Sequence, residues 1–426
     1  MAEAKSIQAV KGMNDIRPGA TEAFLDTAVW QKIFAAAAAV MESFGFRRVW
    51  LPVVEPTALF QRGIGTDTDI VAKEMYSFSD RGERSLTLRP EGTAGAVRAY
   101  VEHNLARVDP IQRWWYAGPM FRAESPQKGR YRQFYQIGAE LLGIADPAAD
   151  AELLWMLWQL CGRLGLFEVA VRVNSVGDND SRKAYRAVLR DYLGRHMTEL
   201  CESCKARLDT NPLRVLDCKR APCRTVVDGA PDILDAMTPA ARQHFDKVLA
   251  LLQALKVPFE RDPRLVRGLD YYTGTTFELT TRALGAQDAI LGGGRYDNLV
   301  EELGGMPTPA VGFAAGVERL ALLVAAAGVP AVGPDLYLVP MAGAEVLAFL
   351  LADGIRSDGR YKVEVGAGRL KQQMKHADRT GARFALVLGE DELTSRRGKL
   401  KNLRATSVEE VALEPSALLG VLARSP

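Results

Sequence analysis

Apolar residues recur along the chain at two spacings, one typical of helices and one typical of strands. Between residues 22 and 44 the spacing is helical and includes Trp30, Ile33 and Phe34, which predicts a long amphipathic helix that Gly45 ends. A strand is predicted next in RRVWLPVVEP (47–56), and a strand, a turn and a helix in SLTLRPEGTAGAVRAYVEH (85–103). An antiparallel pair of strands is predicted from two runs that the polar loop SPQKGR joins, QRWWYAGPMFRAE (112–124) and YRQFYQIGAELLG (131–143).

The pattern changes twice further along, and the changes divide the chain. After a short strand, residues of about 170–260 carry helical and cysteine-bearing segments, which we interpret as a mainly helical insertion. Strand patterns return at 265–295 and again before the helix predicted in VERLALLVAAAG. Pro and Gly gather at 328–334, which predicts a linker, and 335–426 then alternates strands with helices. The predicted fold class is α/β (α+β): a larger domain, 1–327, with an antiparallel sheet flanked by helices, and a small C-terminal α/β domain.

Composition narrows the class of protein. The 426 residues exceed one ordinary core, and 48% hydrophobic with 25% charged residues is typical of a globular chain. We find no apolar signal region at the N-terminus and no apolar run approaching the roughly 18 residues of a membrane helix. Five cysteines, an odd number, favour a reducing cytoplasm over a disulfide framework. The net charge of +2 means that any contact with nucleic acid must come from local charge.

Two polar faces are candidates for a binding site. In an extended strand, Gln136 and Glu140 share a face roughly 13 Å apart, and Gly138 between them leaves room for a ligand. The alternative is a solvated strand face, at even odds. In LRPEGTAG, a turn presents Glu91 and Thr93, which suit an ammonium group. The alternative, favoured for this motif alone, is that either residue caps the following helix.

Basic residues form two further candidates. Arg122 beside the polar loop and Arg319 at the start of an apolar helix suit phosphate, because a guanidinium can bond two oxygens at once. The alternative for each is a structural ion pair. Lys371, Lys375 and Arg379 recur every four residues and predict a basic helix stripe, which either contacts a nucleic-acid backbone or is simply solvated.

Taken together, these segments resemble histidyl-tRNA synthetases, which are class II aminoacyl-tRNA synthetases, of the bacterial type. RRVWLPVVEP resembles motif 1, which builds the dimer interface of that family, while FRAESPQKGRYRQFYQIGAE resembles motif 2 and VGFAAGVERL motif 3. LVRGLDYYTGTTFE and GGGRYDNLVEELGG are similar to the two signatures peculiar to the histidine enzymes. The resemblance implies a cytoplasmic homodimer that attaches L-histidine to tRNA(His) through a histidyl-adenylate, with ATP and Mg²⁺, releasing AMP and pyrophosphate.

The resemblance also implies roles for single residues. The histidine α-amino group would contact Glu91, Thr93 and Gln136. Its imidazole would contact Glu140 and Tyr272, with Tyr271 as a wall. Arg122 and Arg319 would hold the ATP phosphates, and Arg267 would meet the α-phosphate where the carboxylate attacks. Gln127 and Arg130 lie in the motif 2 loop, which would contact the acceptor end of the tRNA. Residues 335–426, including Lys371 and Lys375, would bind the anticodon.

A regular alternating strand does not account for the stretch RGLDYYTGTTFE (267–278). Tyr271 and Tyr272 would lie on opposite faces of a regular strand, yet the resemblance brings both to the ligand. We therefore predict a loop that enters a strand near Thr273, with Gly268 allowing the turn, and structural partners for Asp270 and Glu278.

The chain departs from the family pattern at two places. Ser125 stands where much of the family has arginine in motif 2, so one phosphate or acceptor-stem contact is not implied. The insertion carries Cys201-x2-Cys204 and Cys218-x4-Cys223, which suit a structural zinc site, with free cytosolic thiols as an even alternative. Cys161 is predicted to be a core residue.

Two rival functions use the same fold. A regulatory paralogue, similar to the regulatory subunit of ATP phosphoribosyltransferase, would lack the C-terminal domain, so residues 335–426 count against it. A synthetase-like protein that binds RNA without aminoacylation is opposed by the complete set of substrate residues.

Overall fold

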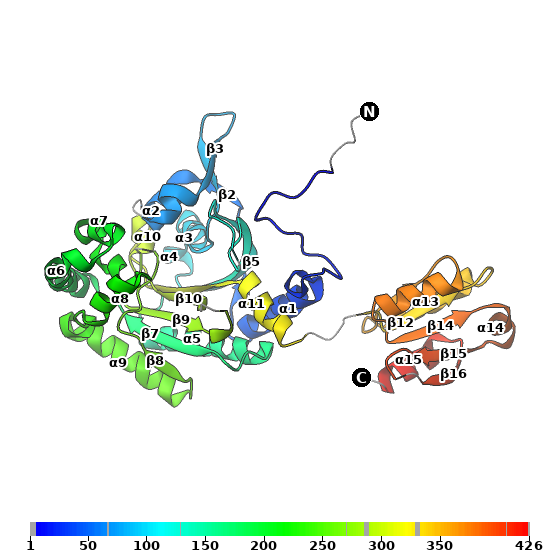
Figure 1. The fold of residues 1–426 in the computed structure, drawn as a ribbon. Helices are drawn as coiled ribbons and strands as arrows, with labels where there is room; N and C mark the ends of the chain where they lie inside the picture. The colour runs from blue at the N-terminus through cyan, green and yellow to red at the C-terminus, as the bar shows by residue number, and fades with distance from the viewer. Residues whose placement is uncertain are drawn as a thin grey trace, which may run out of the picture. The chain divides into compact units, whose positions relative to one another are not determined.

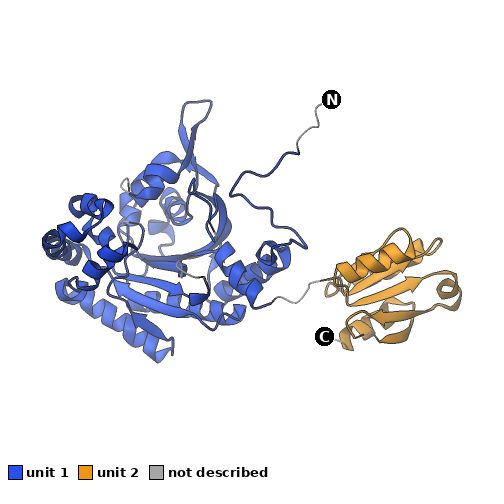
Figure 2. Ribbon diagram, viewed as in Figure 1, with its two compact units in different colours: residues 1–328 blue, residues 329–426 orange. Residues whose placement is uncertain are grey.

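The computed structural model describes residues 6–65, 68–127, 129–269, 271–284, 289–328, 333–405 and 407–424. It divides into two compact units, Met1–Gly328 and Val329–Pro426 (Figure 2). The predicted linker, 328–334, falls largely on residues 329–332, which lie outside the described residues. No helix within the described ranges is long and apolar enough to cross a membrane.

A large sheet organises the first unit (Figure 1). In the described residues its order is β1 (Arg47–Arg48), β5 (Gln112–Phe121), β6 (Gln133–Leu142), β11 (Ala310–Gly316), β10 (Ala289–Arg295), β9 (Thr275–Thr280), β7 (Ala170–Ser175) and β8 (Phe259–Arg261). The pairs inside the sheet are antiparallel, as predicted, whereas the pair at each edge is parallel. The mixed α/β class is therefore confirmed.

Alternation along β6 is confirmed and separates two environments. Ile137, Ala139 and Leu141 are fully buried, and Trp30 of α1 contacts the ring of Tyr135 at 5.1 Å between centroids. Helix α1 packs against α5 and α11, and α5 packs against α9. The bounds are α1 (Thr27–Ser43), preceded by η1 (Ala23–Leu25), α5 (Pro147–Leu164), α9 (Pro239–Ala254) and α11 (Val317–Ala326).

The predicted strand RRVWLPVVEP is wrong as a single element. It forms β1, which joins the large sheet, and β2 (Val54–Pro56), which joins a second sheet with β4 (Ser85–Leu88) and β3 (Tyr76–Ser79). Pro52 lies between the two strands and has no N–H for a continuous ladder. The remaining helices here are α2 (Thr57–Ile64), η2 (Ile70–Glu74), α3 (Thr93–Glu102), α4 (Leu105–Val108), η6 (Arg282–Leu284) and α10 (Leu299–Glu302).

The insertion is mainly helical, as predicted, and it begins with the predicted short strand, whereas the strand at its other end was not predicted. Residues 170–175 and 259–261 are β7 and β8 of the large sheet. The helical part lies between them, with α6, α7 and α8 grouped together (Figure 1). Its elements are α6 (Asn179–Arg195), η3 (Met197–Glu199), α7 (Glu202–Thr210), η4 (Pro212–Asp217), α8 (Ala221–Asp228), η5 (Ile233–Ala236) and α9.

The second unit has its own sheet and core. Its order is β13 (Val363–Val365), β12 (Leu336–Pro340), β14 (Phe384–Leu388), β15 (Arg397–Asn402) and β16 (Val408–Ala412). The first three strands are parallel and were predicted, whereas β15 and β16 are an antiparallel addition that was missed. The helices are α12 (Glu345–Arg356), α13 (Leu370–Arg379), α14 (Glu390–Ser395) and α15 (Pro415–Arg424).

Candidate active site

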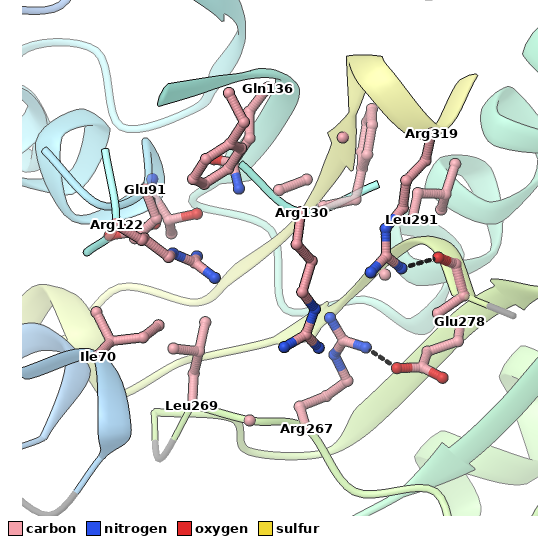
Figure 3. Close-up of a pocket in the computed structure, with 18 of the residues that line it drawn as sticks. Ile70, Glu91, Arg122, Arg130, Gln136, Arg267, Leu269, Glu278, Leu291 and Arg319 are labelled. Carbon is pink, nitrogen blue, oxygen red and sulfur yellow. Dashed lines mark hydrogen bonds and ion pairs between the residues drawn. The ribbon is translucent and has the colours of Figure 1, made fainter. Parts of the chain in front are cut away.

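A cavity of about 350 Å³ lies over the middle strands of the large sheet, a volume typical of small-molecule sites. Its lining comes from η2, β6, β9, β10, β11 and α11, from the turn at Glu91, and from the described residues of two loops, 122–127 with 129–131 and 267–269 with 271–272. Figure 3 shows Glu91 and Arg122 on one side, Arg267 and Glu278 on the other, and Arg130 between them.

Small residues in neighbouring strands make the floor of this cavity. Strand register aligns Gly138 with Ala314 and Gly292, and Glu140 with Gly312 and Gly294. A Cβ atom at Gly292 would lie 2.5 Å from the guanidinium carbon of Arg267, and one at Gly294 would lie 2.8 Å from the ring of Tyr272. The glycine run of GGGRYDNL therefore lets large polar side chains lie flat on the sheet.

Gly138 also makes room, but for a protein side chain. The Tyr116 ring occupies the space that a Cβ atom at Gly138 would need, and the same ring closes the space beside Gly92. The prediction that Gly138 leaves room for a ligand is therefore wrong.

Four tyrosines surround one glutamate and form what we call the tyrosine cluster: Tyr116, Tyr271, Tyr272 and Tyr296 around Glu140. The carboxylate of Glu140 is fully buried and accepts hydrogen bonds from Thr93 Oγ1 at 2.8 Å, from Tyr116 Oη at 2.9 Å and from Tyr296 Oη. Burial raises the pKa of Glu140 to about 8, although these hydroxyls act in the opposite direction. Glu140 thus lies beneath the cavity wall, and Thr93, Tyr271, Tyr272 and Tyr296 form the surface above it.

Both tyrosines of RGLDYYTGTTFE line the cavity, and their ring centroids are 4.7 Å apart. Strand β9 begins at Thr275, two residues later than predicted. The left-handed residue is Gly274, with φ of 101°, and not Gly268. Glu278 has the expected partner, an ion pair with Arg267, while Asp270 lies outside the described residues.

Glu91 combines the two interpretations of its motif. Its carboxylate accepts hydrogen bonds from the backbone N–H of Thr93 at 2.6 Å and of Ala94 at 2.8 Å, which caps the first turn of α3. The same side chain lines the cavity. The cap therefore fixes the orientation of the carboxylate toward the cavity.

Gln136 presents an unused acceptor. Its side chain is 8% exposed, it lines the cavity, and its Oε1 accepts no hydrogen bond from any described residue. Buried polar atoms are rarely left unpaired, so this atom points to a donor supplied by a ligand.

Four arginines line the cavity and form what we call the arginine cluster: Arg122, Arg130, Arg267 and Arg319. Arg122 lies one residue beyond β5, not within it, and its Nε donates to the Pro90 carbonyl at 3.0 Å. Arg319 donates to the carbonyls of Gly129, at 3.3 Å, and Ala289. Burial lowers the pKa of Arg122, while burial and then Arg130 lower the pKa of Arg319. An anion in the cavity would offset both effects.

Carboxylates also face this cluster. Burial acts to lower the pKa of Arg267, but Glu278 together with Tyr272 and Tyr271 outweighs it, so that the pKa is raised. Burial and then Glu124 raise the pKa of Glu74, because a second carboxylate nearby disfavours the negative charge of Glu74. Glu318 accepts from the Tyr135 N–H at 3.0 Å, and burial raises its pKa to about 8.

The predicted tRNA residues occupy exposed positions. Gln127 and Arg130 exchange backbone hydrogen bonds of 3.0 and 2.8 Å across the motif 2 loop, and the Arg130 side chain reaches the cavity. Lys371 and Lys375 are exposed on α13, on one stripe of the helix as predicted. Cys161 is buried in α5, as predicted.

Sequence reasoning missed Tyr116 and Tyr296. Tyr296 lies in the signature GGGRYDNLVEELGG, but no role was predicted for it. The only local signal for Tyr116 was its position directly after Trp114 and Trp115 in a predicted strand.

Comparisons with known proteins agree along the chain. The family model "Histidyl-tRNA synthetase" matches residues 25–320, and the model "Anticodon binding domain" matches residues 335–422. The second match covers the part that the regulatory paralogue would lack.

Individual relatives extend this match over nearly the full length. A histidine–tRNA ligase of Desulfatibacillum aliphaticivorans is 47% identical over 96% of this chain and 97% of its own length. One of Anaeromyxobacter sp. (strain K) is 48% identical over 96% of this chain and 98% of its own. The structure of apo histidyl-tRNA synthetase from S. aureus superimposes with a TM-score of 0.77 at 34% identity, covering 98% of this chain and 99% of that one.

Proposed function

The chain belongs to the histidyl-tRNA synthetase family, and from that premise we propose that its cavity forms histidyl-adenylate and passes the histidyl group to tRNA(His). Attachment of histidine to tRNA for translation is the activity that this membership carries. The observation that carries the proposal for the cavity is its composition, since the unpaired acceptor of Gln136, the carboxylate of Glu91 and several phenols face four arginines across one space.

Histidine would be held by the polar groups near β6. Its ammonium group suits the carboxylate of Glu91, the hydroxyl of Thr93 and the free Oε1 of Gln136. Its imidazole would meet Tyr272 and Tyr296, with Tyr271 packed beside them. We assign Glu140 an indirect part, because it holds Thr93, Tyr116 and Tyr296 by hydrogen bonds. An amino acid without the imidazole would leave such buried groups unpaired, and that selects against it by about 10⁴ or more.

The arginine cluster would hold the phosphates of ATP. In the adenylation step, a carboxylate oxygen of histidine bonds to the α-phosphorus, and the bond from that phosphorus to the bridging oxygen breaks. The electron pair leaves with pyrophosphate. Negative charge grows at the α-phosphorus, where Arg267 would stabilise it, while Arg122 and Arg319 hold the chain of phosphates.

Magnesium would accompany ATP. Glu74 and Glu124 line the cavity, and burial and then repulsion by Glu124 raise the pKa of Glu74. Carboxylates are the ligands that Mg²⁺ prefers, so these two residues fit the ion and would hold it. The ion would supply charge neutralisation on the phosphates.

The remaining partners follow from surfaces. Gln127 and Arg130 would contact the tRNA acceptor end, and Lys371 and Lys375 would contact the anticodon arm.

A homodimer is supported by apolar exposure in the motif 1 segment, where Trp50 is 75% and Val54 39% exposed. Five cysteines without a disulfide support a cytoplasmic location. The four-cysteine cluster would have a structural part only.

Amino-acid-dependent exchange of pyrophosphate into ATP tests the proposal, because it needs no tRNA. Each of the twenty amino acids is offered in turn to the folded full chain. We expect exchange with histidine alone. A folded sample that exchanges with none, or with another amino acid instead, would contradict the proposal.

A further inference from the structure

Four cysteines of the insertion converge on one point. Their Sγ atoms all lie within 4.8 Å of one another, although they come from the start of α7, the end of η4 and the first turn of α8. A tetrahedral zinc–thiolate site with bonds of about 2.3 Å places its sulfurs about 3.8 Å apart. Cys204 and Cys223 are fully buried and Cys201 and Cys218 partly so.

The surroundings favour a metal over isolated thiols or disulfides. The backbone N–H of Cys201 points at Cys223 Sγ at 3.2 Å, a contact that suits a thiolate acceptor. None of the four is in a disulfide. Basic residues follow three of them in sequence, Lys205, Lys219 and Arg224, and would offset the net −2 charge of a zinc ion with four thiolates.

The helices that carry the cysteines are short, so a metal ion would stabilise them. Helices α7 and α8 have 9 and 8 residues, and η4 has 6, so none is long enough to be stable alone. Cys204 and Cys223 belong to a larger buried apolar cluster that also holds Leu208 and Val226, so the ion would add to this packing.

We propose that Cys201, Cys204, Cys218 and Cys223 bind one structural Zn²⁺ that fixes the insertion against the back of the active-site loop. Four sulfur ligands leave no open position for substrate, and none of the four lines the active-site cavity.

The link to the loop runs through the segment between Cys204 and Cys218. Asn211, Leu213 and Arg214 of that segment line a small pocket together with Val266 and with Arg267 and Tyr272. A Cβ atom at Gly268 would lie 3.7 Å from Arg214 Nη1, so the two segments are in direct proximity. The ion would thus act as a positioning element for Arg267 and Tyr272. This second step rests on the proposed roles of those two residues, whereas metal binding does not.

Metal content decides the first step. The full chain, purified without chelator, is measured by inductively coupled plasma mass spectrometry, and we expect about one zinc per chain. Cobalt substituted for zinc should give the intense visible bands of a tetrahedral thiolate site. Absence of metal together with four freely reactive thiols would overturn the proposal, and so would stoichiometric iron in place of zinc.

Variants locate the site. Cys201→Ser, at a partly exposed ligand, and Cys204→Ala should each lose at least nine-tenths of the zinc, while Cys161→Ala, at a buried cysteine outside the cluster, should keep it. Full zinc content in both ligand variants would place the metal elsewhere. Should Cys204→Ala fail to fold, the wild-type stoichiometry and Cys201→Ser still decide.

Loop positioning has its own measurements. After treatment with a zinc-selective chelator, amide hydrogen exchange at 266–272 should rise, and kcat for histidine-dependent exchange should fall about tenfold or more with a smaller change in KM for ATP. Unchanged protection in zinc-free protein would refute the positioning step. If zinc is present but the zinc-replete protein exchanges no pyrophosphate, the proposed function fails and the zinc site stands.

Discussion

The tyrosine cluster and the arginine cluster face the same cavity but are held in opposite ways. Tyr116 and Tyr296 of the first donate to a buried carboxylate of the protein, so their directions are fixed before any ligand arrives. Burial raises the pKa of Tyr116, Tyr271 and Tyr296 well above the usual range, which keeps them neutral donors. In the second, Arg122 and Arg319 donate to backbone carbonyls and burial disfavours their charge, whereas Arg267 and Arg130 are paired with Glu278 and Glu124.

This difference separates selection from chemistry. A neutral network with internal partners can reject a wrong side chain, because any change leaves a buried group unpaired. Arginines gathered around the phosphates gain most when negative charge increases, which happens in the transition state. The following predictions break one cluster at a time.

Arg267→Ala should have the largest effect. Charge that Arg267 meets develops only during adenylation, so kcat for pyrophosphate exchange should fall by about 10²–10³, while the Kd for histidine changes by less than about threefold. Stopped-flow exchange kinetics and equilibrium binding of histidine measure the two separately.

Arg195→Ala is the matched control for Arg267→Ala. Its exposed side chain pairs with Asp191 and does not line the cavity, so exchange should be unchanged. Equal losses of binding and rate in Arg267→Ala would remove the distinction between the clusters on the arginine side.

Glu140→Gln should have the next largest effect, on the opposite parameter. The amide would place a donor against a phenol or the Thr93 hydroxyl and misdirect that group, at a cost of about 1–3 kcal/mol. KM for histidine should rise about 10–100-fold with a smaller fall in kcat, and discrimination against other amino acids should weaken.

Glu152→Gln is the control for Glu140→Gln, because Glu152 pairs with Arg113 away from the cavity and should leave KM unchanged. A loss confined to kcat in Glu140→Gln would mean that the tyrosine cluster serves the chemistry and not selection.

The two clusters also differ in how far the sequence predicts them. Arg122, Arg267 and Arg319 stand out locally, as charges within or beside apolar runs, and the predicted positions all line the cavity. The tyrosine cluster depends on long-range register: Tyr116 reaches Glu140 because β5 places it opposite Gly138, and Tyr296 reaches it across β11 and β10. Local alternation does not encode the order of those strands.

Errors in the predicted elements have the same origin. Residues 47–56 have the pattern of one strand, yet Pro52 divides them between two sheets. Gly268 and Gly274 are equally permissive in sequence, but only Gly274 of the two is left-handed, at a position whose backbone pairs with Val176 and Gly177 far away in the chain. The cysteine pairs were predictable as a group because their spacing alone brings two ligands together twice.

Gln136→Ala should have a smaller effect on binding and a diagnostic effect on stability. Loss of one acceptor for the ammonium should raise KM for histidine about tenfold. Because Oε1 has no partner among the described residues, its removal should not lower the melting temperature of the ligand-free protein. Differential scanning fluorimetry with and without histidine measures both.

Thr87→Ala provides the contrast to Gln136→Ala, since that buried hydroxyl is hydrogen-bonded to Thr57 and its loss should lower the melting temperature. A comparable fall in ligand-free Gln136→Ala would show that Gln136 serves the fold and not the ligand.

The smallest expected effect is a pH dependence of stability that both clusters share. Glu140 lies under the tyrosines and Glu318 precedes Arg319, and burial raises the pKa of each from 4.5 to about 8. The unfolded chain releases these protons near pH 4.5, so the stabilising contribution is fully present below that pH and is lost as the pH rises through 8. Each group changes the free energy of unfolding by at most about 1.4 kcal/mol per pH unit, which corresponds to roughly 2 °C in melting temperature.

The dependence of the melting temperature on pH, measured between pH 5 and 9, should therefore become weaker in Glu140→Gln and in Glu318→Gln but not in Glu152→Gln. If only Glu318→Gln flattens the curve, the three hydroxyls on Glu140 keep it ionised in the folded protein, and the tyrosine cluster holds a charge where we infer a neutral network.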